Sequence, residues 1–267
     1  MKRTDSTLWG MLKPVFGCVH LLPLPGAPLY DGNMNGIFER ALREADLYHH
    51  LGVHGIIIEN FGDAPFYPED VPAETVAFMT AVTREIVQHC PLPVGVNVLR
   101  NDARAAMAVA TAAGAAFIRV NIHMGAMVTD QGLIQGRAHG TTRMRSCLRS
   151  SVKILADTAV KHAVPLAPRP LELDILDLAE RGLVDGVIIT GDRTGGAVNR
   201  EDLIRARSVS PVPVLVGSGT TPDNLPTLIE VADGFIVGSY FKHDGNPLNT
   251  VSGDRVREVM ATRAACV

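Results

Sequence analysis

The chain has 267 residues, of which 46% are hydrophobic and 20% are charged, and its formal net charge is −3. This is the composition of a globular protein, and the lack of a block rich in Lys and Arg argues against nucleic-acid binding. No apolar run is long enough for a membrane helix, and no signal-like segment follows the first residues, so we expect a cytoplasmic protein.

Short apolar runs alternate with longer amphipathic stretches along the whole chain. The runs are typical of parallel strands that are buried on both faces. The predicted strands are Val15–His20, Gly55–Asn60, Val94–Val98, Phe117–Asn121, Val152–Asp157, Gly186–Gly191, Val214–Gly217 and Gly234–Gly238. The predicted helices are Asn35–Leu51, Thr75–His89, Asp102–Ala113, Glu172–Arg181, Glu201–Ser208, Pro222–Val231 and Asp254–Thr262.

Eight such alternations predict an α/β fold, a (β/α)8 barrel in which residues 1–267 form one domain. An open, doubly wound sheet is the alternative, but no GxGxxG follows the first predicted strand. Residues 122–150 make the longest connection between a strand and the next element. This segment is a candidate lid or partner-binding arm, or else a peripheral insertion with its own short helix.

The active site of such a barrel lies at the carboxyl ends of its strands. Nearly every predicted strand ends in polar residues, while the strand middles are apolar. These residues are His20, Glu59, Asn60, Asn97, Arg100, Asn121, His123, Asp157, Thr190, Asp192, Ser218, Ser239 and Lys242. A structural scaffold does not need this ring, although any single member could instead cap a helix or bond to a turn.

Two glycine-rich turns predict a phosphate site. Gly217, Ser218 and Gly219 lie between the seventh strand and a helix that we expect to begin at Pro222 with Thr221 as its N-cap. The eighth strand ends in Gly238 and Ser239. Glycine lets backbone N–H groups approach an anion, and a helix N-terminus adds positive partial charge. The alternative is that both are merely tight turns.

The best catalytic candidates are Asp157 and Lys161, which is followed by His162. A carboxylate and an amine at one strand end can shift each other's pKa and exchange protons, and the lysine could also form a Schiff base. A structural ion pair is the alternative. Glu59 is a second catalytic carboxylate candidate, or else part of a salt bridge across the barrel mouth.

Other strand-end residues are candidates for substrate binding. Asn97 and Asn121 would orient the substrate through their amides, or else bond to neighbouring loops. Asp192 lies in a glycine-rich loop and could bind hydroxyls or a metal, and His20 could contact substrate or be a structural hydrogen-bonding residue.

No cofactor is predicted, although the sequence leaves a bound divalent metal ion as an alternative. No HxH, HExxH or clustered-carboxylate spacing favours a metal site, and none of the four cysteines lies in a CxxC pair. Such barrels often form oligomers, so a homo-oligomer is possible, but the sequence identifies no interface.

The two turns resemble those of the phosphate-binding barrels of tryptophan and histidine biosynthesis. Over essentially its full length the chain also resembles the BtpA/SgcQ family. The motifs that carry this second resemblance are Val19–Gly26, Gly95–Leu99, Gly125–Gly132, Ala156–His162, Gly191–Gly195 and Ala232–Ser239. The resemblance implies a barrel of the ribulose-phosphate-binding type. The family is named for photosystem I biogenesis, other members resemble products of sugar-metabolism operons, and no catalytic residue set carries over.

Two functions follow as hypotheses. The first is an enzyme that acts on a phosphorylated sugar or nucleoside-like metabolite by acid–base isomerisation or bond cleavage. The second is a non-enzymatic assembly or stability factor that uses residues 122–150 as a partner arm. The sequence favours the first, because an assembly factor has no need of an intact phosphate turn, although a barrel can keep an old site after losing its activity.

Overall fold

The computed structural model describes residues 7–158, 163–191 and 198–267. The predicted site residues Lys161 and Asp192, together with His162, lie outside these ranges. Within them, no helix is both long and apolar enough to cross a bilayer.

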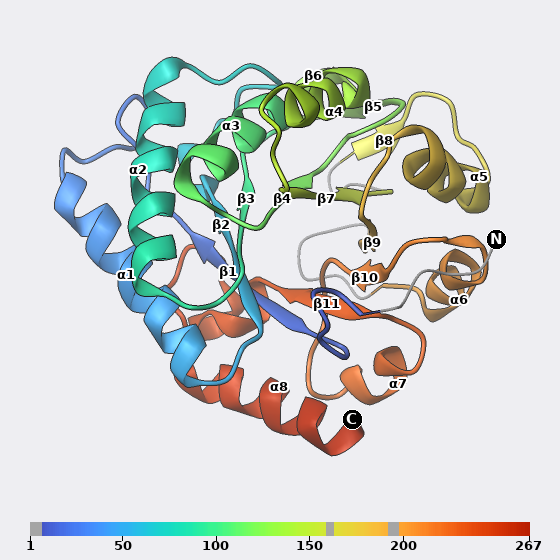
Figure 1. Ribbon diagram of the computed structural model, residues 1–267. Coiled ribbons are helices and arrows are strands. Elements are labelled where there is room, and N and C mark those ends of the chain that lie inside the picture. The colour runs from blue at the N-terminus through green and yellow to red at the C-terminus, as the bar shows by residue number, and fades with distance from the viewer. Residues whose placement is uncertain (1–6, 159–162, 192–197) are drawn as a thin grey trace.

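Eight strands close into a barrel in the order β1-β11-β10-β9-β7-β4-β3-β2, and all neighbouring strands are parallel (Figure 1). They are β1 Val15–His20, β2 Gly55–Glu59, β3 Val94–Asn97, β4 Phe117–Val120, β7 Lys153–Asp157, β9 Gly186–Ile189, β10 Val214–Val216 and β11 Gly234–Val237. The barrel prediction is therefore confirmed. Six of the predicted strands run one or two residues too far, because their last residues have left the ladder.

Helices surround the barrel (Figure 1). They are α1 Met34–His50, α2 Ala73–His89, α3 Ala103–Ala113, α4 Ala138–Cys147, α5 Leu171–Leu176, α6 Arg200–Val209, α7 Leu225–Ile229 and α8 Gly253–Cys266. The predicted start of α7 at Pro222 is wrong. The side chain of Asn224 accepts a hydrogen bond from the N–H of Thr221 and donates to the carbonyl of Gly219, which holds the preceding residues in a turn.

A small antiparallel sheet beside the barrel is not predicted by the sequence. Its order is β6-β5-β8, with β5 Ala126–Thr129, β6 Gly132–Gln135 and β8 Ala163–Pro165. The hairpin of β5 and β6 and then α4 fill the long connection of residues 122–150, so the segment has a helix of its own but also two strands. Strands this short carry too few residues for an alternating pattern to be recognised.

Apolar side chains fill the half of the barrel nearer the amino ends of the strands and close that end. Phe16 and Phe117 meet there, with ring centroids 5.5 Å apart, and Trp9 packs on both at 5.8 and 5.1 Å. Ile57, Leu155, Ile188, Leu215 and Ile236 belong to the same buried cluster. The interior is therefore plugged at one end, and its free space lies at the carboxyl ends of the strands.

Candidate functional site

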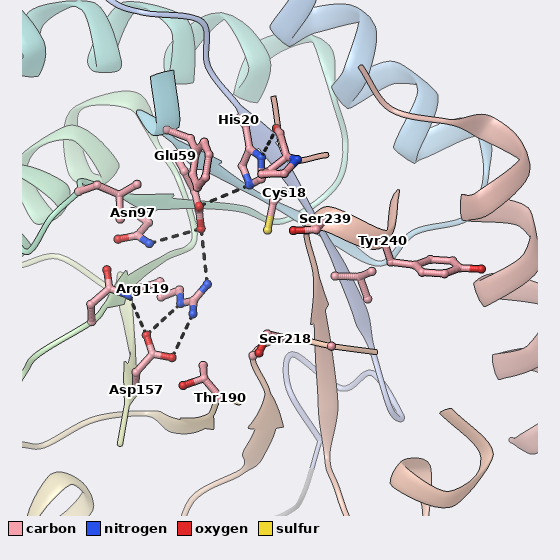
Figure 2. A pocket seen from close by; sticks show the side chains of 18 of the residues that line it. Cys18, His20, Glu59, Asn97, Arg119, Asp157, Thr190, Ser218, Ser239 and Tyr240 are labelled. Carbon is pink, nitrogen blue, oxygen red and sulfur yellow. Dashed lines mark hydrogen bonds and ion pairs between the residues drawn. The ribbon is translucent and has the colours of Figure 1, made fainter. Parts of the chain in front are cut away.

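A cavity of about 440 Å³ opens at the carboxyl end of the barrel. Every described residue for which the sequence predicts a catalytic, substrate-binding or phosphate-binding role lines it, whereas the strand-end residues Asn60, His123 and Lys242 do not. The residues with a predicted role that line it are His20, Glu59, Asn97, Asn121, Asp157, Gly217, Ser218, Gly219, Gly238 and Ser239. They come from the ends of seven of the barrel strands, and Figure 2 shows several of them converging on one space.

The alternation of a β-strand brings these polar residues together. Successive side chains of a strand point to opposite faces, so residues two apart both point into the barrel. Phe117 lies in the apolar plug, and Arg119 and Asn121, two and four residues later, line the cavity. Leu155 and Asp157 repeat this arrangement on β7. The cavity is thus lined by a polar layer, which lies directly on the apolar plug of the barrel.

Arg119 is the centre of the polar layer, although it is absent from the residues that the sequence predicts for the site. Its Nε and one terminal nitrogen each donate to Asp157, with both bonds 3.1 Å long (Figure 2). Asn121 Nδ2 donates to the same carboxylate at 3.0 Å. Burial alone would lower the pKa of Arg119, but Asp157 and Glu59 outweigh burial and raise it above its usual value. Arg119 therefore stays charged, and its guanidinium forms a bidentate ion pair with Asp157.

Glu59 is held more loosely than Asp157. Its carboxylate lies 3.6 Å from Arg119 and 3.6 Å from His20 Nε2, and Asn97 Nδ2 donates to it at 3.3 Å. These contacts are longer than those of Asp157, and the side chain is nevertheless almost completely buried. Of the two carboxylates, Glu59 is therefore the one with more capacity to accept a further hydrogen bond.

His20 is a neutral imidazole near pH 7. Burial lowers its pKa to about 4, despite the opposing effect of Glu59. Its Nδ1 lies 2.8 Å from the carbonyl oxygen of Pro247, so Nδ1 carries the proton and donates it to that oxygen. Nε2 is then an acceptor, and it faces the Glu59 carboxylate.

The turn after β10 combines close packing with an unusual backbone conformation. A Cβ on Gly217 would lie 2.4 Å from Ile188 Cγ2 and 2.5 Å from Thr190 Cγ2, so no larger residue fits without movement. Gly219 has a φ of +72°, a conformation that glycine adopts at little cost. Ser218 Oγ accepts a hydrogen bond from the N–H of Gly191 at 3.2 Å, which ties this turn to the end of β9.

The turn after β11 leads into the short 3-10 helix η3, Ser239–Phe241. The first N–H groups of a helix have no partner within it, so those of Ser239 and Tyr240 are available to an anion. Arg255, in the first turn of α8, also lines the cavity. Its guanidinium lies 4.4 Å from the centre of the Tyr240 ring, and its Nε donates to the Tyr240 carbonyl at 2.6 Å. A fixed positive charge therefore accompanies this turn.

Two side-chain atoms in the cavity wall are buried without a hydrogen-bond partner among the described residues: Asn121 Oδ1 and Thr220 Oγ1. Buried polar atoms are nearly always paired in folded proteins, and unpaired ones require an explanation. Their place in the wall of this cavity fits a ligand that donates to Asn121 and exchanges a hydrogen bond with Thr220.

Lys242, one of the predicted strand-end residues, lies away from the cavity. It is fully buried beside the barrel and makes a 2.7 Å ion pair with Glu44, which Arg40 also contacts at 3.2 Å. Burial lowers the pKa of Lys242, and Glu44 opposes this effect. We therefore interpret Lys242 as a structural residue, whose buried ion pair with Glu44 helps to fix the chain after β11.

No metal centre is evident in the part of the chain that the structure describes. There, no three His, Cys, Asp or Glu side chains gather in a way that could hold an ion. The polar layer instead pairs its carboxylates with Arg119 and the amide groups of Asn97 and Asn121.

Solved structures with a similar fold include enzymes whose names refer to phosphorylated compounds. Phosphoribosyl anthranilate isomerase from Thermus thermophilus matches with a TM-score of 0.58 at 13% identity, over 95% of this chain and 100% of that one. Thiamine phosphate pyrophosphorylase from Pyrococcus furiosus matches with a TM-score of 0.58 at 13% identity, over 96% of this chain and 97% of that one. At such identities the likeness establishes the barrel fold alone.

Sequence relatives are much closer. An uncharacterized protein of Thermococcus kodakarensis is 47% identical over 93% of this chain and 94% of its own length. The photosystem I biogenesis protein BtpA of Synechocystis is also 47% identical, over 91% of this chain and 85% of its own length. The BtpA family model matches residues 11–265. The chain therefore belongs to the BtpA family.

Proposed function

We propose that this protein is an enzyme that binds a phosphorylated small metabolite and transforms it by acid–base chemistry, as an isomerase, a lyase or a hydrolase. One observation carries the proposal: a single cavity adjoins both glycine-rich turns and the buried carboxylates of Glu59 and Asp157. A substrate held by its phosphate at the turns would place its remaining atoms over those carboxylates.

The turns support an anion site through their backbone and one charge. Gly217, Gly219 and Gly238 leave the backbone accessible, and Ser218 and Ser239 add hydroxyl donors. The guanidinium of Arg255 adds a full positive charge at the same end of the cavity. Phosphate recognition by backbone N–H groups after the last two strands is frequent in barrels of this type.

The polar layer supports different roles for its two carboxylates. Asp157 accepts three hydrogen bonds of 3.0–3.1 Å from Arg119 and Asn121, which fix its position and that of Arg119. Glu59 has only longer contacts, so we assign it the role of proton acceptor, with Asn97 and Asn121 orienting substrate hydroxyls. Lys161 and Asp192, outside the described residues, stay predicted as an acid–base partner and a hydroxyl-binding residue.

A ligand screen with matched variants tests the anion site. Thermal shift and calorimetry would compare glycerol 3-phosphate, ribose 5-phosphate and nucleoside 5′-monophosphates with their dephosphorylated counterparts. We expect at least one ester, and not its counterpart, to stabilise the protein. Ser239→Asn should keep that binding. Ser239→Asp introduces a side chain of the same size as asparagine but with a negative charge, so it should lose the binding by charge repulsion. If no ester binds, or if both variants bind alike, the proposal is wrong.

Turnover of the ligand identified in that screen tests the chemistry. Phosphorus and proton NMR would follow the ester in the presence of wild-type protein and of Glu59→Gln. We expect the variant to bind the ester and to lose turnover by about 10²- to 10⁴-fold, the usual contribution of a positioned acid or base. A variant as active as the wild type would remove Glu59 from the mechanism.

A partner-binding role is a second candidate, favoured by one surface feature. Val128, Leu133 and Val164 face one another across β5, β6 and β8, and each is about half exposed or more. Together with the name of the cyanobacterial relative, this row suits an assembly factor. Complementation of a cyanobacterium lacking its own relative would distinguish the two roles. If the protein is an assembly factor, the double variant Glu59→Ala and Asp157→Ala should still complement and Val128→Glu should not. If it is an enzyme, Val128→Glu should complement and the double variant should not.

A further inference from the structure

One wall of the cavity is aromatic, in contrast to its polar floor. Phe61 begins the 3-10 helix η1, Phe61–Asp63, directly after β2, and Phe66 follows in the same loop. The ring of Phe61 stacks on His20, with centroids 4.4 Å apart and planes 17° apart, and Phe66 meets Phe61 edge-on at 6.3 Å. Three rings thus form one continuous surface, and all three residues line the cavity.

The loop that carries these rings is rigidly held. Asp63 accepts hydrogen bonds from the N–H of Leu24 at 2.8 Å and from Asn60 Nδ2 at 3.0 Å. A Cβ on Gly62 would lie 2.5 Å from the backbone nitrogen of Pro23, so the loop packs tightly against the one after β1. The aromatic wall is therefore preorganised, and a ligand would not have to order it.

The loop after β3 completes this wall. Asn60 Oδ1 accepts from the N–H of Leu99 at 2.7 Å, and the Tyr67 carbonyl accepts from the N–H of Arg100 at 3.0 Å. These bonds join the two loops into one unit that also brings the Arg100 side chain to the cavity. Phenyl rings and a guanidinium are the groups that pack best on the faces of a planar ring.

The aromatic wall begins beside the turn after β11 and extends away from it. In the barrel, β1 lies between β11 and β2, and a Cβ on Gly238 would lie 3.6 Å from His20 Nε2, the ring on which Phe61 stacks. A ligand that reaches from the turns to Phe61 and Phe66 therefore passes His20 and the Glu59 carboxylate, which lies 3.6 Å from His20 Nε2. It therefore needs an anionic end, a middle rich in hydroxyl groups and a flat apolar end.

We propose that the substrate is a phosphorylated sugar that bears a planar aromatic or heteroaromatic ring, as nucleoside monophosphates do, and that the ring packs against Phe61 and Phe66. This inference rests on the proposed phosphate site and narrows its ligand from any phosphate ester to this class. A plain sugar phosphate would fill the turns and the floor but would leave the aromatic wall unused.

The test compares ligands that differ only in the ring. Calorimetry would measure ribose 5-phosphate and the adenosine, guanosine, cytidine and uridine 5′-monophosphates, with hexyl phosphate as an apolar ester without a ring. We expect at least one nucleotide to bind about fivefold or more tightly than ribose 5-phosphate and hexyl phosphate, which corresponds to the lower end of base–aromatic stacking energies.

Variants of the wall assign this advantage to Phe66. Phe66→Ala should remove it while leaving ribose 5-phosphate affinity unchanged, and Phe66→Leu, which keeps apolar volume without a flat face, should remove most of it. Tyr67→Ala is the matched control, because its exposed side chain does not line the cavity. Equal binding of ribose 5-phosphate, hexyl phosphate and all nucleotides would overturn the ring inference and leave the phosphate site standing. If no phosphate ester of any kind binds, the phosphate site itself is refuted.

Discussion

Replacing Arg119 by methionine tests whether the polar layer is held together by one charge. The guanidinium neutralises Asp157 at 3.1 Å and lies 3.6 Å from Glu59, and all three side chains are at most 9% exposed. Removing the cation leaves two buried carboxylates facing each other. Loss of one partner from a buried ion pair costs about 3–5 kcal/mol, and we expect Arg119→Met to lower the free energy of unfolding by this amount.

The loss should depend on pH in a direction that follows from the charges. Without the guanidinium, two buried negative charges repel each other, and protonation of either carboxyl removes that repulsion. The variant should therefore be least destabilised at low pH and should lose stability as the pH rises. Adding Asp157→Asn to the variant removes one charge, so it should restore part of the stability at neutral pH.

Urea denaturation followed by circular dichroism, at several pH values, measures these differences. Arg205→Met is the matched control, because Arg205 makes an equally bidentate pair with Glu172 on the surface, at 2.7 and 2.9 Å. Solvent screens such a pair, so its loss should change stability little. An Arg119→Met protein that is no less stable than Arg205→Met would refute the view that this guanidinium holds the polar layer together.

Two further predictions concern single residues of the cavity. Because burial lowers the pKa of His20 to about 4, folding favours its neutral form, so wild-type stability should fall by about 3 kcal/mol as the pH falls from 6.5 to 4. His20→Gln should flatten that part of the urea-derived stability profile, and a variant of the exposed His50 should not. Gly217→Ala should cost about 1–3 kcal/mol by overpacking against Ile188, whereas Gly238→Ala, whose Cβ meets nothing nearer than 3.6 Å, should keep its stability but bind phosphate esters more weakly. Equal melting temperatures for the two alanine variants would contradict this division of roles.

The strands could be predicted from the sequence because each of them is a short apolar run, and each predicted run forms one strand of the barrel. The errors at the strand ends have one cause. Residues such as Asn60, Asn121 and Gly191 directly follow an apolar run in the sequence, but they lie in the loop and not in the hydrogen-bonded strand. The start of α7 could not be predicted from its Thr-Pro signal. A side-chain bridge from Asn224 competes with that signal, and its hydrogen bonds appear only in three dimensions.

Arg119 shows what a pattern of residue types leaves out. A single charged residue inside an apolar strand looks like an exception until the alternation is followed through Phe117, Arg119 and Asn121, which all point into the barrel. That parity was available in the sequence, and it is the signal that could have found the residue. Its pairing with Asp157 was not, because it depends on β4 and β7 being neighbours in the closed barrel.

The pair of His20 and Glu59 carries a consequence for how a ligand binds. With its proton on Nδ1, His20 presents a lone pair at Nε2 to a carboxylate oxygen 3.6 Å away, so two acceptors face each other at the cavity wall. Burial lowers the pKa of His20 to about 4, so Nε2 stays an acceptor at neutral pH. A sugar hydroxyl has a single proton, so it can donate to the Glu59 carboxylate or to His20 Nε2, but not to both. Donation to Glu59 is the arrangement required by the proton transfer that we assign to Glu59, and His20 Nε2 competes for the same proton.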